Sequence, residues 1–199
     1  MKLHPIHINQ KNDEELMVLI MDHHSHPALI ELHKRYSKKL LGYFIKMLNK
    51  DIDKAQDFVQ DLFLKIMEKK HLFDPEKKFY TWIFTIANNM CKTAYRNPFL
   101  QRISEDGYEI NSKASLSDNL AEKEFFNLLL EKSLNNLEEH HKTTFILRFM
   151  EHFSLQEIAD ITETSLGTVK SRLFYATQKM AKELKEYNPK FESNLFKLN

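Results

Sequence analysis

The feature that most constrains this chain is a pair of helix start signals between residues 154 and 182. Ser154 and Glu157 have the spacing of a capping box, in which a hydroxyl and a carboxylate satisfy backbone N–H groups of a first helical turn. Ser165 can cap a second helix after one short helix and a turn. The segment therefore predicts a helix-turn-helix, and an ordinary helical hairpin with a solvated face is the alternative.

The second helix of this pair separates an apolar stripe from a small, polar and basic outer face. We expect the stripe to be buried, and it consists of Leu166, Val169, Leu173, Ala176 and Met180. The outer face is flanked by Lys170 and Arg172. A helix with this division can enter a DNA major groove.

Scarce chain-breaking residues indicate an all-α fold. The 199 residues include only three glycines and five prolines, and no long alternating run of β-branched residues occurs. Cys91 is the only cysteine, the N-terminus has no apolar signal core, and no stretch approaches the about 18 continuous apolar residues of a membrane span. We therefore expect a soluble, cytoplasmic protein that does not span a membrane.

The net charge of +1 conceals a segregation of charge along the chain. Residues 77–102 contain no acidic residue and carry the basic residues Lys77, Lys78, Lys92, Arg96 and Arg102. Residues 104–124 are mainly acidic and include Glu105, Asp106, Glu109, Asp118, Glu122 and Glu124. This pattern indicates two basic contact surfaces with an acidic linker between them.

Apolar periodicity and its interruptions predict two small helical domains. The expected domains are residues 13–97 and 122–187, joined by an acidic linker at 98–121 and flanked by tails at 1–12 and 188–199. In the first domain we expect helices over 14–47, broken at 22–27 beside Pro27, then over 53–69 and 81–96. In the second we expect helices over 122–134 and 141–150, followed by the helix-turn-helix.

The helix predicted over 53–69 has a well-defined apolar side. Its inward residues are Ala55, Phe58, Val59, Leu62, Phe63 and Ile66. Its outward residues are Gln56, Asp57, Gln60, Asp61 and Lys65. Asp57, Gln60 and Asp61 therefore share one solvent-facing side.

Two motifs in the first half and three in the second, in this order, resemble a known family. The first half contains Asp57-Phe-Val-Gln-Asp-Leu-Phe and Phe79-Tyr-Thr-Trp-Ile-Phe-Thr-Ile-Ala-Asn-Asn. The second half contains Phe145-Ile-Leu-Arg-Phe, Ser154-Leu-Gln-Glu-Ile-Ala and Gly167-Thr-Val-Lys-Ser-Arg-Leu. Together they resemble bacterial RNA polymerase sigma factors of the extracytoplasmic-function (ECF) class of the sigma-70 family, which retain regions two and four. The resemblance covers about residues 14–97 and 122–185.

The resemblance implies a transcription initiation factor without enzymatic activity and without a cofactor. Such a protein directs core polymerase to promoters, recognises the minus-ten and minus-thirty-five elements and assists promoter melting. The implied partners are the clamp helices of the largest polymerase subunit, the flap of the second-largest subunit, promoter DNA and an anti-sigma protein. The implied clamp contacts are Asp57, Gln60 and Asp61.

The resemblance also implies where DNA is held. The loop from His71 to Tyr80 would hold an extruded base, and the implied minus-ten residues are Phe79, Tyr80, Asn88, Asn89, Lys92, Tyr95 and Arg96. Phe79, Tyr80 and Trp82 could equally be core aromatics, and for Trp82 we favour the core. The implied minus-thirty-five residues are Ser165, Thr168, Lys170, Ser171, Arg172 and Phe174. Tyr175 stands where the family often has arginine, so the resemblance assigns no base contact to it.

The acidic linker has two interpretations. It could be a disordered connector, or, as in related sigma factors, it could thread the active-site cleft and RNA exit channel of polymerase. In the second case Glu105, Asp106, Glu109 and Asp118 would face a basic tunnel.

Two other classes of protein remain open. One is a stand-alone helix-turn-helix regulator, which leaves the Asp57 face without a role. The other is a metal-dependent helical hydrolase using Asp22, His23, Glu138 and His141. Two histidine groups, at 23, 24 and 26 and at 140, 141 and 152, have poor metal-ligand spacing, and no CxxC or HExxH pattern accompanies them. We therefore expect no metal site.

Overall fold

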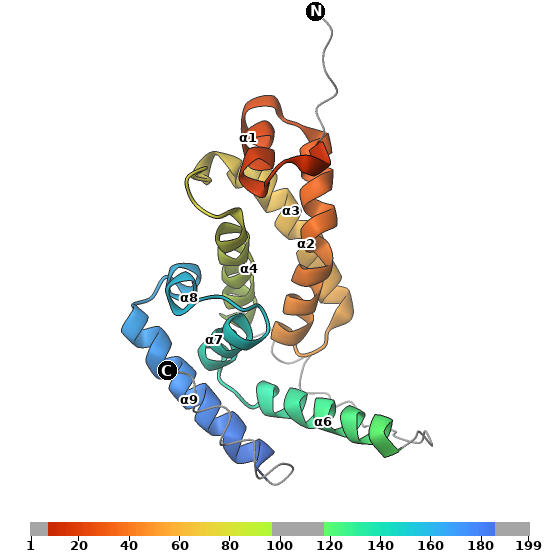
Figure 1. The fold of residues 1–199 in the computed structure, drawn as a ribbon, viewed down its shortest axis with the longest axis vertical. Helices are drawn as coiled ribbons and strands as arrows, with labels where there is room; N and C mark the ends of the chain where they lie inside the picture. The colour runs from red at the N-terminus through yellow and green to blue at the C-terminus, as the bar shows by residue number, and fades with distance from the viewer. Residues whose placement is uncertain (1–7, 97–117, 186–199) are drawn as a thin grey trace, which may run out of the picture. The chain divides into compact units, whose positions relative to one another are not determined.

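The computed structural model describes residues 8–96 and 118–185, and every regular element within these ranges is a helix. The chain divides into two compact units, one mainly of residues 1–93 and the other mainly of residues 94–199. Helices α1 to α4 form the first unit and α6 to α9 form the second (Figure 1). The all-α, two-domain prediction is confirmed. Among the described residues, no helix has the length and apolar character to cross a membrane.

The helices of the first unit follow the predicted order. They are the 3₁₀ helix η1 (Ile8–Gln10), α1 (Asp13–His23), α2 (His26–Met47), α3 (Ile52–Lys69), the 3₁₀ helix η2 (Lys70–Leu72) and α4 (Phe79–Arg96). The predicted break at 22–27 is present. His24 adopts a left-handed conformation with φ of 50°, and Ser25 accepts a hydrogen bond from Ala28 N as the cap of α2. Pro27 lies in the first turn of α2, where its missing N–H costs nothing.

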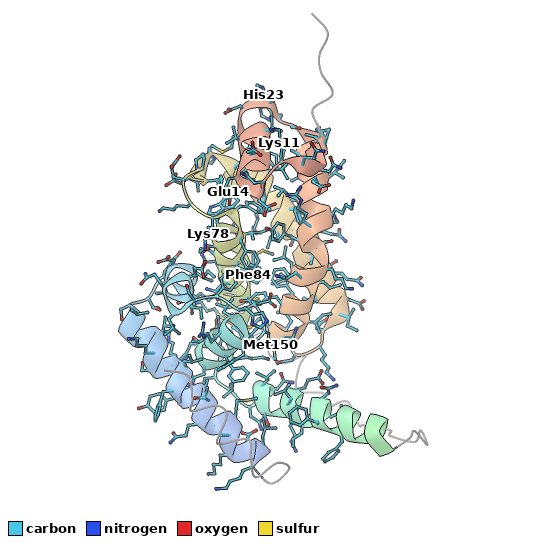
Figure 2. The ribbon with its side chains drawn as sticks, viewed as in Figure 1. Lys11, Glu14, His23, Lys78, Phe84 and Met150 are labelled. Carbon is cyan, nitrogen blue, oxygen red and sulfur yellow. The ribbon has the colours of Figure 1, made fainter. Side chains whose placement is uncertain are left out.

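An aromatic core holds α2, α3 and α4 together. Tyr43 and Phe44 of α2 and Phe84 of α4 are fully buried. The Tyr43 and Phe84 rings meet edge to face at 5.3 Å, and Figure 2 shows Phe84 projecting from α4 toward α2. Phe44 makes a similar contact with Phe58 of α3, which is half-buried. Because aromatic pairs add to the free energy of burial, this cluster fixes the surfaces of α3 and α4 relative to each other.

A polar network fastens α1 to α2. Arg35 donates from Nη1 to Asp13 Oδ1 at 2.7 Å and from Nε to Glu31 Oε1 at 2.8 Å. Tyr36 donates its hydroxyl hydrogen bond to the other carboxylate oxygen of Asp13. One carboxylate therefore accepts from two neighbouring α2 side chains, so α1 is held in register with α2.

This network predicts an alkaline loss of stability. Burial, and then the hydrogen bond to Asp13, raise the pKa of Tyr36 above its ordinary value of 10.0. Above about pH 10 the unfolded chain therefore ionises this tyrosine while the folded chain does not, and the free energy of unfolding falls by up to about 1.4 kcal/mol per pH unit. Tyr36→Phe should remove this component. Denaturant titrations between pH 9 and 11, followed through Trp82, the single tryptophan, report on the first unit. Parallel pH profiles for the two proteins would contradict the assignment.

Helix α4 receives its N-terminal cap from a distant helix. Phe79 N donates to Glu14 Oε1 of α1 at 2.8 Å, across 65 residues of sequence. In Figure 2 Glu14 lies beside Lys78, immediately before α4 begins. A carboxylate at a helix N-terminus satisfies a backbone N–H and interacts favourably with the helix dipole. The position of α4 thus depends on α1.

The second unit contains α6 (Asp118–Asn135), α7 (Glu139–Phe149), α8 (Leu155–Thr162) and α9 (Leu166–Leu184). Both α6 and α7 pack against α9. Helix α6 begins at Asp118, four residues before the predicted start and inside the segment predicted as linker. Glu105, Asp106 and Glu109 of that linker lie outside the described residues, as do residues 1–7 and 188–199 of the predicted tails and the last two residues of the predicted second domain.

The helix-turn-helix signals are confirmed atom by atom. Ser154 N donates to Glu157 Oε2 at 2.9 Å, and Glu157 N donates to Ser154 Oγ at 3.2 Å. Ser165 Oγ accepts from Thr168 N at 3.1 Å and caps α9. Glu163, in the turn between α8 and α9, adopts a left-handed φ of 56°. The two start signals therefore define α8 and α9.

The predicted apolar stripe of α9 needs correction at two positions. Leu166 is 38% exposed and Leu173 is half-buried, whereas Val169, Ala176 and Met180 are buried as predicted. The side chain of a first helical residue tilts toward the N-terminus and thus beyond the covered part of the helix, which explains Leu166. The buried stripe instead continues through Thr177, Ala181 and Leu184.

Candidate protein-binding and nucleic-acid-binding surfaces

Helix α3 presents the predicted polar face to solvent. Asp57, Gln60 and Asp61 are all exposed, while Ala55 and Leu62 on the opposite side are buried. Gln60 and Asp61 follow Asp57 by three and four positions, so all three residues lie on one side of the helix. The structure therefore brings the predicted polymerase-binding residues together as a single acidic surface.

An exposed leucine lies within this acidic surface. Leu64 is 63% exposed and follows Gln60 by four positions and Asp61 by three. Leu64 was not among the residues predicted to face inward or outward, although an apolar residue on the polar side of an amphipathic helix is a signal that the sequence contains. We call the set Asp57, Gln60, Asp61 and Leu64 the α3 face. It combines carboxylates with an exposed apolar side chain, as protein-binding surfaces do.

The loop before α4 turns its aromatic side chains inward. Phe73 is 3% exposed and Phe79 has no exposed surface. Their rings lie 6.0 Å apart, and Phe73 also meets half-buried Trp82 at 5.2 Å. Phe79 therefore belongs to the core, and its assignment to the DNA-binding surface is corrected. Trp82 packs on this core and keeps an exposed part.

Tyr80 lies on the outer side of this cluster beside a cation from α2. Lys39 Nζ donates to the Tyr80 hydroxyl at 3.1 Å and lies 4.8 Å from the ring centroid. Tyr80 is half-buried and Lys39 is exposed. Lys39 was not predicted from the sequence, because 41 residues separate it from Tyr80. An aromatic ring with an adjacent ammonium is suited to a nucleotide, which offers a base to stack and a phosphate to neutralise.

The rest of the predicted minus-ten residues lie along α4. Asn88, Lys92 and Arg96 recur every fourth position and so follow one side of the helix. Arg96 is exposed, and Lys92 is half-buried. The half-buried residues Asn89 and Tyr95 flank them. Asn88 is buried.

Helix α9 presents most of the predicted duplex contacts outward. Lys170, Ser171 and Phe174 are exposed, and Thr168 and Arg172 are half-buried. Ser165 is exposed as well, but its hydroxyl lies 2.8 Å from Thr168 Oγ1 and caps the helix. We therefore assign Ser165 to positioning the N-terminus of α9 rather than to reading bases.

Tyr175 extends the outward surface of α9. Its side chain is exposed, and its ring meets that of Phe174 at 5.6 Å in an edge-to-face contact. The structure places both aromatic side chains on the surface, where apolar contact with a thymine methyl group is chemically available.

One group of metal-ligand side chains lies together in residues 8–96 and 118–185. It consists of Glu138, His140 and His141. From the sequence, Glu138 and His141 were paired only in the hydrolase alternative, together with Asp22 and His23, and His140 and His141 were grouped with His152. The structure instead brings Glu138, His140 and His141 together.

Comparisons with known proteins connect both units to one family. Residues 32–98 match Sigma-70 region 2, and residues 127–180 match Sigma-70, region 4. The ECF RNA polymerase sigma-E factor of Haemophilus influenzae is 31% identical over 157 residues, which are 74% of this chain and 82% of that protein. The RNA polymerase sigma-H factor of Pseudomonas aeruginosa is 26% identical, over 89% of this chain and 96% of its own length.

Solved structures share the fold. CnrH, in complex with the cytosolic domain of CnrY, has a TM-score of 0.65 at 20% identity and covers 87% of this chain and 97% of its own. The sigma factor RpoE of Bartonella quintana, in complex with the anti-sigma factor NepR, has a TM-score of 0.56 at 29% identity, over 74% of this chain and 91% of its own. With both family regions present in order in one helical chain, the protein belongs to the sigma-70 family as a sigma factor of the ECF class.

Proposed function

We propose that the α3 face of this sigma factor binds the polymerase clamp while α4 and α9 hold the two promoter elements. The observation that carries the proposal is the ordered presence of regions 2 and 4 in one chain, at residues 32–98 and 127–180. A stand-alone regulator needs only the second of these. Sigma factors initiate transcription while the core polymerase performs the nucleotide chemistry, so we assign no catalytic residue and place the protein with polymerase in the cytoplasm.

Clamp binding is assigned to Asp57, Gln60, Asp61 and Leu64. Carboxylates suit basic groups on a partner and orient the encounter. A central apolar side chain that is desolvated on binding contributes the affinity that exposed charges do not supply by themselves. The α3 face contains both components on one helix, which supports its assignment as a protein interface.

Minus-ten binding is assigned to the outer side of the loop and α4. The residues proposed to contact DNA are Tyr80, Asn89, Lys92, Tyr95 and Arg96, with Asn88 after local rearrangement. Lys39 joins them because its ammonium lies over the Tyr80 ring. Opening a promoter requires unstacking at a cost of a few kcal/mol per base, which stacking on an aromatic ring can offset. Phe79 supports this surface from beneath.

Minus-thirty-five binding is assigned to Thr168, Lys170, Ser171, Arg172 and Phe174 of α9, with Ser165 as the cap. Arg172→Ala should weaken binding of holoenzyme to a promoter duplex by about 1–3 kcal/mol, because an arginine can pair with a guanine edge. Lys170→Ala should lower the slope of log K against log salt by about 0.9 for one lost phosphate contact. Fluorescence anisotropy across a salt series measures both effects.

A matched control for these two substitutions lies further along the same helix. Gln178 is exposed on α9 and carries no charge, so Gln178→Ala should leave affinity and salt slope unchanged. If all three variants bind the duplex as the parent does, α9 does not read the minus-thirty-five element.

An anti-sigma protein is the proposed regulator. The relative from Bartonella quintana was solved with an anti-sigma factor. In this chain, exposed apolar side chains occur within both proposed polymerase and DNA surfaces, at Leu64 and at Phe174 and Tyr175. A protein that covers them would block both surfaces together.

Run-off transcription over a pool of promoter sequences tests the proposed function. Core polymerase supplemented with the chain should produce transcripts from a subset of promoters that core alone does not use, and the enriched sequences should share two elements. If the pool yields identical transcripts with and without the chain, the chain does not direct initiation.

A further inference from the structure

A compact set of metal-ligand atoms lies where α7 begins. Glu138, His140 and His141 each offer one ligand atom, and these atoms all lie within 4.8 Å of one another. Glu138 Oε2 is 3.4 Å from His140 Nε2, and the two imidazole centroids are 4.2 Å apart. Ligands of a tetrahedral zinc ion, with bonds of about 2.0–2.1 Å, are roughly 3.3 Å apart. Small side-chain rotations can therefore bring all three residues onto one ion.

The side chains of Glu138 and His140 can make these rotations at low cost. Glu138 is the N-cap residue of α7, yet its side chain makes no capping hydrogen bond. Its side chain is 70% exposed, and that of His140 is 43% exposed. Their movement therefore does not disturb a packed core. A carboxylate that is not used for capping, beside two imidazoles, presents a donor set that suits zinc, nickel or copper ions.

His141 connects this cluster to α9. Its ring lies 6.0 Å from that of Tyr175. The cluster therefore lies beside the outward surface of α9, and Arg172 and Lys179 of that helix are close enough to act electrostatically on His141.

We propose that Glu138, His140 and His141 bind one divalent transition-metal ion of the zinc class, and that the bound ion strengthens the hold of α9 on duplex DNA. Three protein ligands leave one position of a tetrahedral ion to water. The ion adds positive charge on the side of Arg172, which increases attraction to phosphate. It also holds His141 at the Tyr175 ring and so fixes the start of α7 on α9, which it packs against (Figure 1).

The surrounding charges set the character of the site. Arg172 and Lys179 oppose an incoming cation, while the carboxylate of Glu138 attracts it. We therefore expect an ion that exchanges with the surrounding pool rather than one that is permanently held. Such a site makes promoter binding sensitive to metal concentration.

Calorimetric titration of the intact protein with zinc chloride tests the site. A double variant, His140→Gln with His141→Gln, should lose one bound equivalent or bind it at least about tenfold more weakly. The matched control is His152→Asn, which removes a third histidine of the same unit at a left-handed φ of 61° that asparagine tolerates. This control should bind zinc as the parent does. If parent and double variant bind the same number of ions with the same affinity, the proposal is overturned.

The effect on DNA is measured by holoenzyme binding to a promoter duplex in zinc-free buffer and with added zinc. The parent should bind several-fold more tightly with zinc, and the double variant should not respond. An unchanged parent affinity at saturating zinc would contradict the coupling to α9. This readout rests on the proposed function, but the calorimetry does not. Run-off by the parent in zinc-free buffer tests the proposed function alone.

Discussion

Reversing the charge of the α3 face, by Asp57→Lys together with Asp61→Lys, should abolish holoenzyme formation at concentrations where the parent assembles fully. Each substitution replaces a carboxylate that suits a basic partner with a cation that repels it. Loss of a buried, hydrogen-bonded charge pair at an interface costs about 2–5 kcal/mol, which is roughly 30-fold to several thousand-fold in affinity. Native gel shift or pull-down with purified core polymerase measures the loss.

The controls separate this surface from general charge and folding effects. Asp22→Lys with Glu76→Lys changes the net charge by the same amount at exposed sites outside α3, and it should leave assembly intact. Exposed substitutions usually change the free energy of unfolding by less than about 0.5 kcal/mol, so denaturation of both double variants should match the parent. If the α3 variant assembles normally, the acidic surface does not bind the polymerase.

A substitution at Leu64 separates the apolar contribution of the α3 face from the contribution of its charges. Leu64→Ser removes apolar area and preserves charge, so it should weaken assembly through faster dissociation. The charge variants should also slow association, and that part of their effect should diminish in high salt.

Truncating Phe79 to alanine should cost about 3–5 kcal/mol of the free energy of unfolding of the first unit, because the fully buried ring leaves a cavity that the fold closes only in part. Phe79 has no exposed surface and contacts Phe73 and Tyr36. Denaturant unfolding monitored through Trp82 fluorescence measures this effect.

Phe79→Leu then separates a core role from a role at DNA. This more conservative apolar substitution should cost far less than the truncation and leave promoter opening near the parent level. Tyr80→Leu, on the outer side of the same cluster, should reduce opening because it removes a stacking ring that is worth about 1–3 kcal/mol per base. Permanganate footprinting of the open complex reports on both. If both leucine variants lose promoter opening equally while each keeps the parent's free energy of unfolding, Phe79 contacts DNA and its assignment to the core alone is wrong.

The sequence was sufficient for features encoded by nearby residues. The Ser154–Glu157 capping box, the Ser165 cap and the inner stripe of α3 depend on spacings of three or four positions, and each is present in the structure. Pro27 and the break before it follow from the stereochemistry of one residue. Such signals survive folding because they specify local backbone geometry.

The contacts that could not be predicted from the sequence join residues far apart in the chain. The Glu14 cap of α4, the Asp13–Arg35 pair and the Lys39–Tyr80 contact join residues separated by 65, 22 and 41 positions. Phe79 was assigned to DNA because an aromatic residue at a helix start suits either role, and only the packing of Phe73 and Tyr36 around it decides. Leu166 fits the apolar period of α9, but at the first position of the helix its side chain is 38% exposed.

The central claim is that one chain holds polymerase and both promoter elements at once. The most direct measurement is the yield of run-off transcript from one responsive promoter whose minus-ten and minus-thirty-five elements are scrambled separately, with core polymerase and the full chain. We expect that scrambling either element alone abolishes the specific transcript. Raising the concentration of the chain should restore little of the transcript yield. Full transcription from a template lacking one of the two elements would contradict it.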